Sequence, residues 1–201
     1  MLSRINLAII MSMVSTESDD FDKSKIIILN GVSSVGKTSV AKAIQNHAEK
    51  AFVHIQMDDF LEMLPRRALG NRDGLVFERI DSQTIDVQFG DLVQRALAGM
   101  RSAVASMAEC GNNIVVDDVF FADEDSEYRR LLEPYDYRLV ALFAPLEVIQ
   151  TRERMRGDRD IGLAKGQFEI VHKDRVYDLE FDTSKKFPDQ IAKEICKTYS
   201  L

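Results

Sequence analysis

The chain has 201 residues, of which 45% are hydrophobic and 29% are charged, and its formal net charge is −7. This length and composition predict a globular domain that can bury a sizeable core. The acidic balance argues against a protein that binds duplex nucleic acid, because such proteins normally carry a basic excess. The two cysteines, Cys110 and Cys196, are too few and too far apart for a disulfide framework or a zinc site. We therefore expect reduced thiols and a cytoplasmic protein.

Residues 1–23 are predicted to be a loosely ordered extension, followed by one domain over residues 24–201. Residues 7–11 form an apolar run, but this run is too short to cross a membrane. No small-residue cleavage site follows the run, so it does not fit a signal peptide. We expect no association with a membrane.

A phosphate-binding loop follows the first predicted strand, residues 25–30. The loop has the pattern Gly-x-x-x-x-Gly-Lys-Thr, and a helix is predicted from Lys37 to about Glu49. The two glycines let successive backbone N–H groups face one concavity, and the helix directs its positive end there. Lys37 can reach the outer phosphates, and the Thr38 hydroxyl is placed to hold Mg²⁺. The pattern predicts that a nucleoside triphosphate binds at Gly31, Val32, Ser33, Ser34, Val35, Gly36, Lys37 and Thr38.

The remaining elements alternate between strands and helices, which predicts an α/β fold with a parallel, doubly wound sheet. The predicted long helix depends on apolar residues at three- and four-residue steps between Phe89 and Met107. Residues 66–81 are predicted to be irregular. We predict strands at 51–57, 113–116, 137–143 and 177–181, and helices after residue 58, at about 84–109, and at 126–133, 145–156, 161–172 and 188–199.

Two carboxylates follow predicted strands and are expected at the edge of the sheet that carries the phosphate-binding loop. Residues 114–117 are an apolar run that ends in Asp117, the pattern of a strand that brings a carboxylate to Mg²⁺. Asp118 is the alternative for this role. Asp58 could accept the proton of an acceptor hydroxyl as the hydroxyl attacks the γ-phosphate. The alternative is that Asp58 or Asp59 caps the short helix that follows.

Three arginines have the spacing of one helix face: Arg152, Arg156 and Arg159 stand at i, i+4 and i+7. Gly157 and the charged residues after it predict that the helix breaks into a mobile lid. Arginines in a lid could clamp the triphosphate, because the planar guanidinium matches phosphate oxygens in pairs. We therefore assign Arg152 to nucleotide binding and Arg156 and Arg159 to catalysis. The alternative is an ordinary solvated helix face.

Several stretches together resemble the chloramphenicol phosphotransferase family, a branch of the small P-loop kinases. The resemblance implies a three-layer P-loop kinase fold with a five-stranded parallel sheet and a helical lid. It implies that ATP and Mg²⁺ are used to phosphorylate a hydroxyl of a small molecule, and that Asp58 is the catalytic base. It also implies that Arg156 and Arg159 belong to the lid and that Asp182 and Thr183 lie near the adenine. The stretches are residues 31–38, 57–65, 114–120, 156–159, 171–172 and 177–183.

One region departs from the family. Arg66, Arg67 and Arg72 fall where such kinases build the acceptor pocket, although chloramphenicol is neutral. We hypothesise an acceptor that carries a carboxylate or a phosphate, and the alternative is that these arginines are solvated. Met57, Met63 and Phe77 are candidates for lining this pocket, with the core as the alternative.

Two other functions compete with a hydroxyl kinase. One is a nucleoside or nucleotide kinase. The other is a nucleotide-operated switch, which is disfavoured because the chain contains neither Asn-Lys-x-Asp nor Asp-x-x-Gly.

Overall fold

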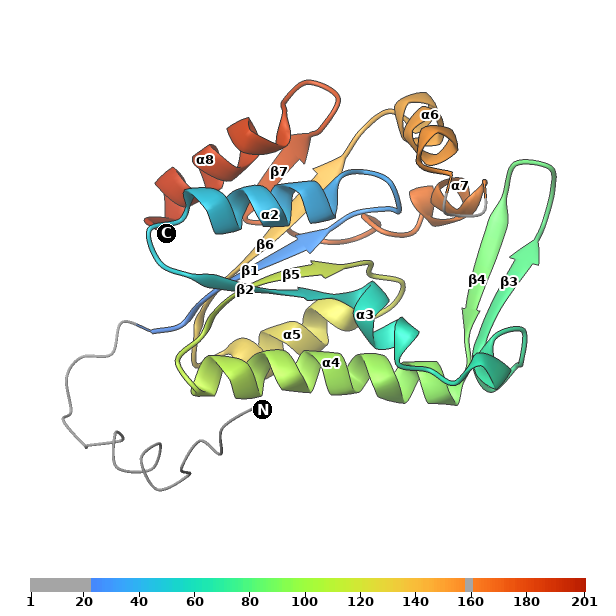
Figure 1. Ribbon diagram of the computed structural model, residues 1–201, viewed down its shortest axis with the longest axis horizontal. Helices are drawn as coiled ribbons and strands as arrows, with labels where there is room; N and C mark the ends of the chain where they lie inside the picture. Colours follow the sequence, from blue (N-terminus) through green and yellow to red (C-terminus); the bar gives the residue numbers. More distant parts are fainter. Residues whose placement is uncertain (1–22, 158–160) are drawn as a thin grey trace, which may run out of the picture.

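A computed structural model describes residues 23–157 and 161–201. The predicted extension, except for Lys23, lies outside this range. Five parallel strands form the central sheet in the order β2-β5-β1-β6-β7 (Figure 1). The strands are β1 (Lys25–Asn30), β2 (Phe52–Gln56), β5 (Asn113–Asp118), β6 (Asp136–Phe143) and β7 (Leu179–Asp182).

The sheet is the middle of three layers (Figure 1). Strand β1 is apolar on both faces because it is covered on both. Ile27 and Leu29 pack into the core under α2 (Lys37–His47) and α8 (Pro188–Tyr199). Ile26 and Ile28 pack into the opposite core, which α3 (Met57–Glu62), α4 (Asp91–Glu109) and α5 (Glu124–Leu132) complete. The predicted three-layer P-loop kinase architecture with five parallel strands is confirmed.

A smaller group of elements stands beyond the carboxyl ends of the strands. It consists of the 3₁₀ turn Arg66–Ala68, the antiparallel hairpin β3 (Leu75–Arg79) and β4 (Ile85–Phe89), α6 (Leu146–Arg156) and α7 (Leu163–Phe168). Helix α7 lies against β4, and the Ile85 N–H donates to the Gly162 carbonyl at 3.0 Å. These elements are placed to surround a ligand at the edge of the sheet.

The predicted long helix is wrong over its first seven residues. Ile85, Val87 and Phe89 belong to β4, and the helix begins only at Asp91. The break occurs at Gly90, where an added Cβ atom would lie 2.2 Å from the Arg72 carbonyl oxygen. The boundary therefore coincides with a close approach of two chain segments that leaves no room for a side chain at position 90.

Three other predicted boundaries need correction. Residues 66–81 are not irregular throughout, because they contain the 3₁₀ turn and β3. The helix predicted at 161–172 is limited to Leu163–Phe168, and the strand predicted at 177–181 is Leu179–Asp182.

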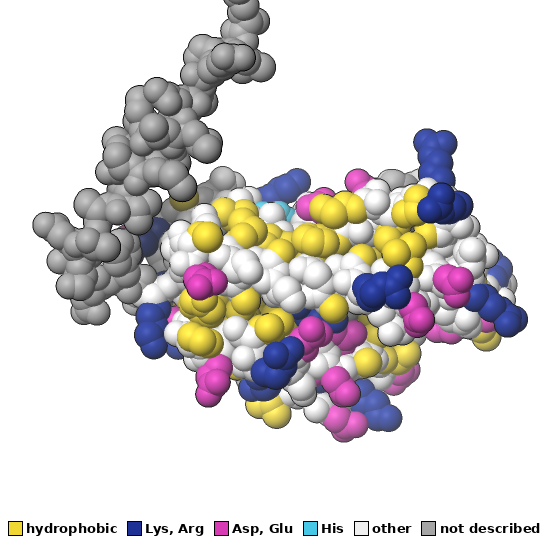
Figure 2. Space-filling model, turned by 90° about the horizontal axis from the view of Figure 1, so that it is seen from below, with side chains coloured by type: hydrophobic (Ala, Val, Ile, Leu, Met, Phe, Trp, Pro, Cys, Tyr) yellow, Lys and Arg dark blue, Asp and Glu magenta, His cyan; other side chains and the backbone are white. Residues whose placement is uncertain are grey.

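Of the helices in the described residues, none has the length and apolar character needed to cross a bilayer. The face around α4 carries acidic and basic side chains next to hydrophobic ones (Figure 2).

Candidate active site

The loop of residues 31–38 connects β1 to α2, and its glycines are required by its shape. A Cβ atom at Gly31 would lie 2.4 Å from the Leu142 carbonyl oxygen in β6. Gly36 has φ +110°, a left-handed conformation that favours glycine, and it immediately precedes the first residue of α2. The loop therefore curls tightly and leaves the amide end of α2 facing the cavity described below.

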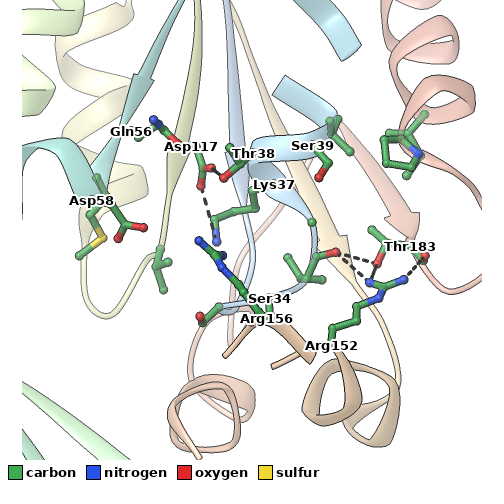
Figure 3. Close-up of a pocket in the computed structure, with 18 of the residues that line it drawn as sticks. Ser34, Lys37, Thr38, Ser39, Gln56, Asp58, Asp117, Arg152, Arg156 and Thr183 are labelled. Carbon is green, nitrogen blue, oxygen red and sulfur yellow. Dashed lines mark hydrogen bonds and ion pairs between the residues drawn. The ribbon is translucent and has the colours of Figure 1, made fainter. Parts of the chain in front are cut away.

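Lys37, Thr38 and Asp117 meet at the mouth of this loop (Figure 3). The Thr38 hydroxyl donates to Asp117 Oδ2 at 2.6 Å, and Lys37 Nζ lies 3.6 Å from Asp117 Oδ1. Lys37 Nζ also donates to the carbonyls of Gly31 and Val32, at 2.9 and 3.1 Å. The sequence prediction that β5 delivers a carboxylate beside the loop agrees with this geometry.

The adjacent Asp118 faces the other side of the sheet, because successive side chains of a strand alternate. It accepts hydrogen bonds from the Val119 N–H at 2.8 Å and from the Tyr128 hydroxyl at 2.9 Å. Burial raises the pKa of Asp118 to about 6. Of the two aspartates, Asp117 is thus the one next to Thr38.

A first cavity of about 480 Å³ lies over the loop, and Asp58 stands on its wall (Figure 3). The N-cap of α3 is Gln56, with Asp58 and Asp59 in the first helical turn. The capping alternative for the two aspartates is therefore wrong. The residues that line the cavity include Ser33, Ser34, Lys37, Thr38, Gln56, Asp58, Asp117, Arg152, Arg156, Thr183, Lys186 and Ile191.

A second cavity of about 300 Å³ adjoins the first, and Ser33, Met57, Asp58 and Val119 line both. Six of its twelve described lining residues come from the β3–β4 hairpin and from α7, elements whose contribution to a site sequence reasoning missed. Apart from Ser33, Asp58 and Gln167, its described lining is apolar. The apolar residues are Met57, Leu61, Leu75, Phe77, Val87, Phe89, Val119, Phe121 and Leu163. Met57 and Phe77 line this cavity, as predicted. Met63 does not line it, and its side chain is 71% exposed.

The arginines between Pro65 and Phe77 do not line the second cavity. Arg66 lines a third, more open cavity together with Asp58 and Arg156. Arg67 and Arg72 are exposed and are not among the residues that line any of the three cavities meeting at Asp58.

Two of the three arginines predicted to act together come from α6 and line the first cavity. Arg152 donates to the Val35 carbonyl at 3.1 Å, and to Oγ1 and the carbonyl of Thr183 at 2.8 and 2.7 Å. It thereby ties α6 to the phosphate-binding loop and to the chain after β7. Arg156 lies one turn further on and extends toward Lys37 and Asp117 (Figure 3). Helix α6 ends at Arg156, with Gly157 as its C-cap, where the break was predicted, and Arg159 lies outside the described residues.

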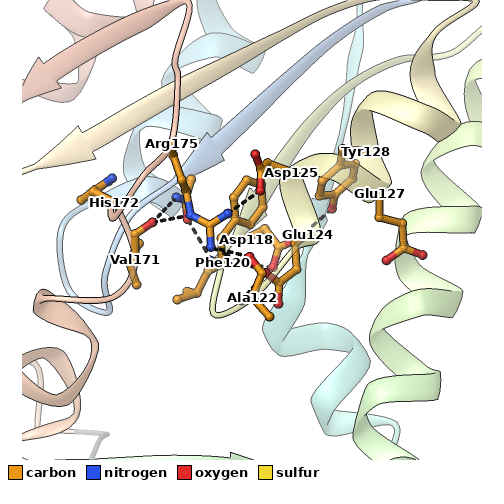
Figure 4. Close-up of polar contacts among 12 residues, drawn as sticks. Asp118, Phe120, Ala122, Glu124, Asp125, Glu127, Tyr128, Val171, His172 and Arg175 are labelled. Atoms are coloured by element: carbon orange, nitrogen blue, oxygen red, sulfur yellow. Dashed lines mark hydrogen bonds and ion pairs between the residues drawn. The ribbon is translucent and has the colours of Figure 1, made fainter.

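A buried polar network fixes the chain just behind the loop (Figure 4). The Asn30 side chain donates to the Val171 carbonyl at 3.0 Å and to the Tyr177 hydroxyl at 2.7 Å, and accepts from the Phe120 N–H at 3.0 Å. Arg175 joins the same Val171 carbonyl to the Asp125 carboxylate. The network therefore ties the end of β1, where the loop begins, to the chain after β5 and to the segment before β7. Sequence reasoning missed this network.

The fold and this site define a P-loop kinase that acts on a small molecule. A family model described as "Chloramphenicol phosphotransferase-like protein" matches residues 24–200. A relative from Mycobacterium tuberculosis (strain H37Rv), "Putative O-phosphotransferase Rv2636", is 30% identical over an alignment of 187 positions that covers 88% of this chain and 83% of the relative. The chain belongs to the chloramphenicol phosphotransferase-like family, as its sequence motifs predicted.

Solved structures of other kinases share the fold. The APS kinase CysC of Mycobacterium tuberculosis has a TM-score of 0.63 at 15% identity, over 89% of this chain and 99% of that chain. The shikimate kinase of Aquifex aeolicus has a TM-score of 0.51 at 15% identity, over 87% of this chain and 96% of that chain. At these identities the likeness establishes the architecture and leaves the acceptor to be argued from the site.

Proposed function

We propose that this protein transfers the γ-phosphate of ATP, with Mg²⁺, to the hydroxyl of a small, neutral and largely apolar molecule. The position of Asp58 carries the proposal: this residue lines both the cavity over the phosphate-binding loop and the adjoining apolar cavity. A carboxylate at such a junction can contact the acceptor on one side and face the γ-phosphate on the other.

The first cavity suits the nucleotide. The loop amides and the amide end of α2 favour the phosphates, and Lys37 adds a positive charge within the loop. Arg156 lies on the same cavity wall, where a guanidinium can stabilise charge on the transferred group. Arg152 and Thr183 hold the far wall, and Lys186 and Ile191 extend it toward the adenine end.

The residues at the mouth of the loop fit Mg²⁺. Thr38 Oγ1 and Asp117 Oδ2 lie 2.6 Å apart, and both are oxygens of the kind that ligate Mg²⁺. This ion is commonly held by one or two protein oxygens together with phosphate oxygens and water. When bound, the ion neutralises charge on the β- and γ-phosphate oxygens. Thr38 and Asp117 would hold it at the position predicted from the sequence.

The chemical step follows from these positions. Asp58 accepts the proton of the acceptor hydroxyl while the hydroxyl oxygen forms a bond to the γ-phosphorus. The bond from that phosphorus to the bridging oxygen breaks, and ADP is the leaving group. Lys37 and Arg156 hold the charge that spreads over the transferred group.

The second cavity favours a neutral acceptor over the anionic one that Arg66, Arg67 and Arg72 suggested. Among the described residues that line this cavity, none carries a positive charge. A carboxylate or phosphate placed against this apolar lining would be desolvated beside Asp58, whereas the cationic side chains near Asp58 line the first and third cavities, so a neutral acceptor is favoured.

An ADP-release assay across a panel of alcohols tests the proposal. The panel contains chloramphenicol, neutral aromatic alcohols, sugar acids, nucleosides and nucleotides. We expect ADP release that depends on an acceptor, with neutral apolar alcohols preferred. Turnover of anionic alcohols alone would contradict the proposed acceptor class, and ADP release that no alcohol stimulates would contradict the kinase proposal.

A further inference from the structure

The phosphate-binding loop makes one contact that neither its motif nor the proposed chemistry uses. The backbone N–H of Ser33 donates to Oε1 of Gln167, in α7, at 2.7 Å. The two residues are 134 positions apart in the sequence, and both are buried, with exposures of 2% and 5%. Ser33 lines both the first and the second cavity, whereas Gln167 lines the second.

The direction of this hydrogen bond fixes the orientation of the Gln167 amide. A backbone N–H can only donate, so the oxygen of the side-chain amide faces Ser33 and the NH₂ group faces elsewhere. Gln167 and Ser33 are, with Asp58, the polar residues among the described lining of an otherwise apolar cavity. An NH₂ group in such surroundings is strongly favoured to donate to a polar partner.

The position of Gln167 is held by its surroundings. Helix α7 lies between α6 and the β3–β4 hairpin (Figure 1). At Gly166 an added Cβ atom would lie 1.9 Å from the Ile85 carbonyl oxygen, so the helix is in close contact with β4. The fully buried Glu153 of α6 accepts hydrogen bonds from the Gly162 and Ala164 N–H groups, at 2.8 and 2.9 Å. A side chain on a helix held this way can orient a ligand.

We propose that Gln167 is a specificity-determining residue whose NH₂ group donates to an uncharged oxygen of the acceptor, next to the hydroxyl that faces Asp58. The preferred acceptors are then neutral alcohols with a carbonyl, ether or nitro oxygen close to the hydroxyl. The inference rests on the proposed function. It goes further by assigning a second polar contact and the chemical group that it recognises.

Two alcohols with the same skeleton test this contact: 2-phenylethanol, and 2-hydroxy-1-phenylethanone, in which a carbonyl replaces one CH₂ group. The wild type should prefer the ketone in kcat/KM by about 2- to 12-fold, the range that one net hydrogen bond of about 0.5–1.5 kcal/mol provides. Gln167→Met, which is close in shape, should abolish the preference. Because this change also removes the acceptor of the Ser33 N–H, the preference is measured as the ratio of kcat/KM for the two alcohols, which an equal loss of rate with both does not alter.

Two further variants separate recognition from a structural role. Gln167→Glu keeps an oxygen for the Ser33 N–H but cannot donate, so it should also lose the preference. Gln88→Met replaces an exposed glutamine on β4 that does not line the cavity, so it should keep the preference. An equal loss of rate with both alcohols in Gln167→Met and Gln167→Glu would overturn the inference in favour of a structural role.

A binding measurement keeps the inference testable if neither alcohol is phosphorylated. The side-chain NH₂ resonance of Gln167, assigned by its loss in Gln167→Met, should shift when 2-hydroxy-1-phenylethanone is added, and shift less with 2-phenylethanol. A shift without ADP release by any alcohol would refute the kinase proposal but support the contact. The absence of a shift with either compound would overturn the contact, whatever the assay gives.

Discussion

The carboxylate of Glu153 should be a main determinant of how α7, and with it one wall of the second cavity, is held. Glu153 is completely buried in α6, and both of its oxygens accept N–H groups at the start of α7. Hydrogen bonds to a charged group contribute about 1.5–3 kcal/mol each. Glu153→Ala removes both and leaves buried donors unpaired, so it should lower the free energy of unfolding by about 3–6 kcal/mol. Glu153→Gln keeps one acceptor oxygen and should lower the free energy of unfolding by about half as much.

Urea denaturation measures these losses, and amide hydrogen exchange locates them. The Gly162 and Ala164 amide protons should exchange faster in both variants, before the protons of β1 do, because α7 loosens while the sheet stays folded. The control is Glu147→Gln, an exposed change in the first turn of the same helix. It should lower the free energy of unfolding by about 0.3–1 kcal/mol. If Glu153→Ala costs no more than this control, the carboxylate does not hold α7 and the reasoning is refuted.

Two other predictions concern the loop and its supporting network. Lys37→Ala should lower turnover about 100-fold or more while the circular dichroism spectrum stays unchanged, because a charge that stabilises the transferred group is lost; rates close to wild type would contradict the assignment. His172 Nδ1 lies 2.9 Å from the Tyr177 hydroxyl of the network, and burial lowers the pKa of His172 below the ordinary 6.5. As the pH falls through 6.5, the unfolded chain therefore binds a proton that the folded chain does not, and stability is lost. Between pH 7.5 and 5.5 the wild type should lose more unfolding free energy than His172→Gln, and equal losses would show that His172 does not titrate differently in the two states.

The parts of the fold that sequence predicts well are those with a strong local signal. Strand β1, the loop and α2 follow from one apolar run and one glycine pattern, and β5 follows from the apolar run that ends in Asp117. The β3–β4 hairpin was missed because β3 follows a stretch with two glycines and three arginines that predicts irregular structure, and because Phe89 of β4 also fits the helical spacing of α4. The alternation of Ile85, Val87 and Phe89, together with Gly90, was the signal that could have revealed β4.

The site was predictable where one segment supplies its residues and less so where distant segments meet. The phosphate-binding loop and Asp58 stand at the cavities as the sequence predicted. The apolar wall from the hairpin depends on a packing arrangement that no motif encodes. Gln167 lacks any local signature, since a glutamine in a short helix is ordinary until its contact with the Ser33 N–H is seen. Sequence also could not tell that, of the three arginines between Pro65 and Phe77, Arg66 lines a cavity beside Asp58 and Arg67 and Arg72 line none of the three cavities that meet there.

The central claim is that Asp58 acts on the acceptor hydroxyl, and one comparison of variants tests it most directly. With MgATP and the best alcohol from the panel, kcat should fall about 10²–10⁴-fold in Asp58→Asn, the range for loss of a general base. ATP binding should stay close to wild type, and the exposed neighbour Asp59 provides the control, Asp59→Asn, which should retain most of the activity. Full activity in Asp58→Asn would contradict the account and favour a kinase that phosphorylates a phosphate group, which needs no base at this position.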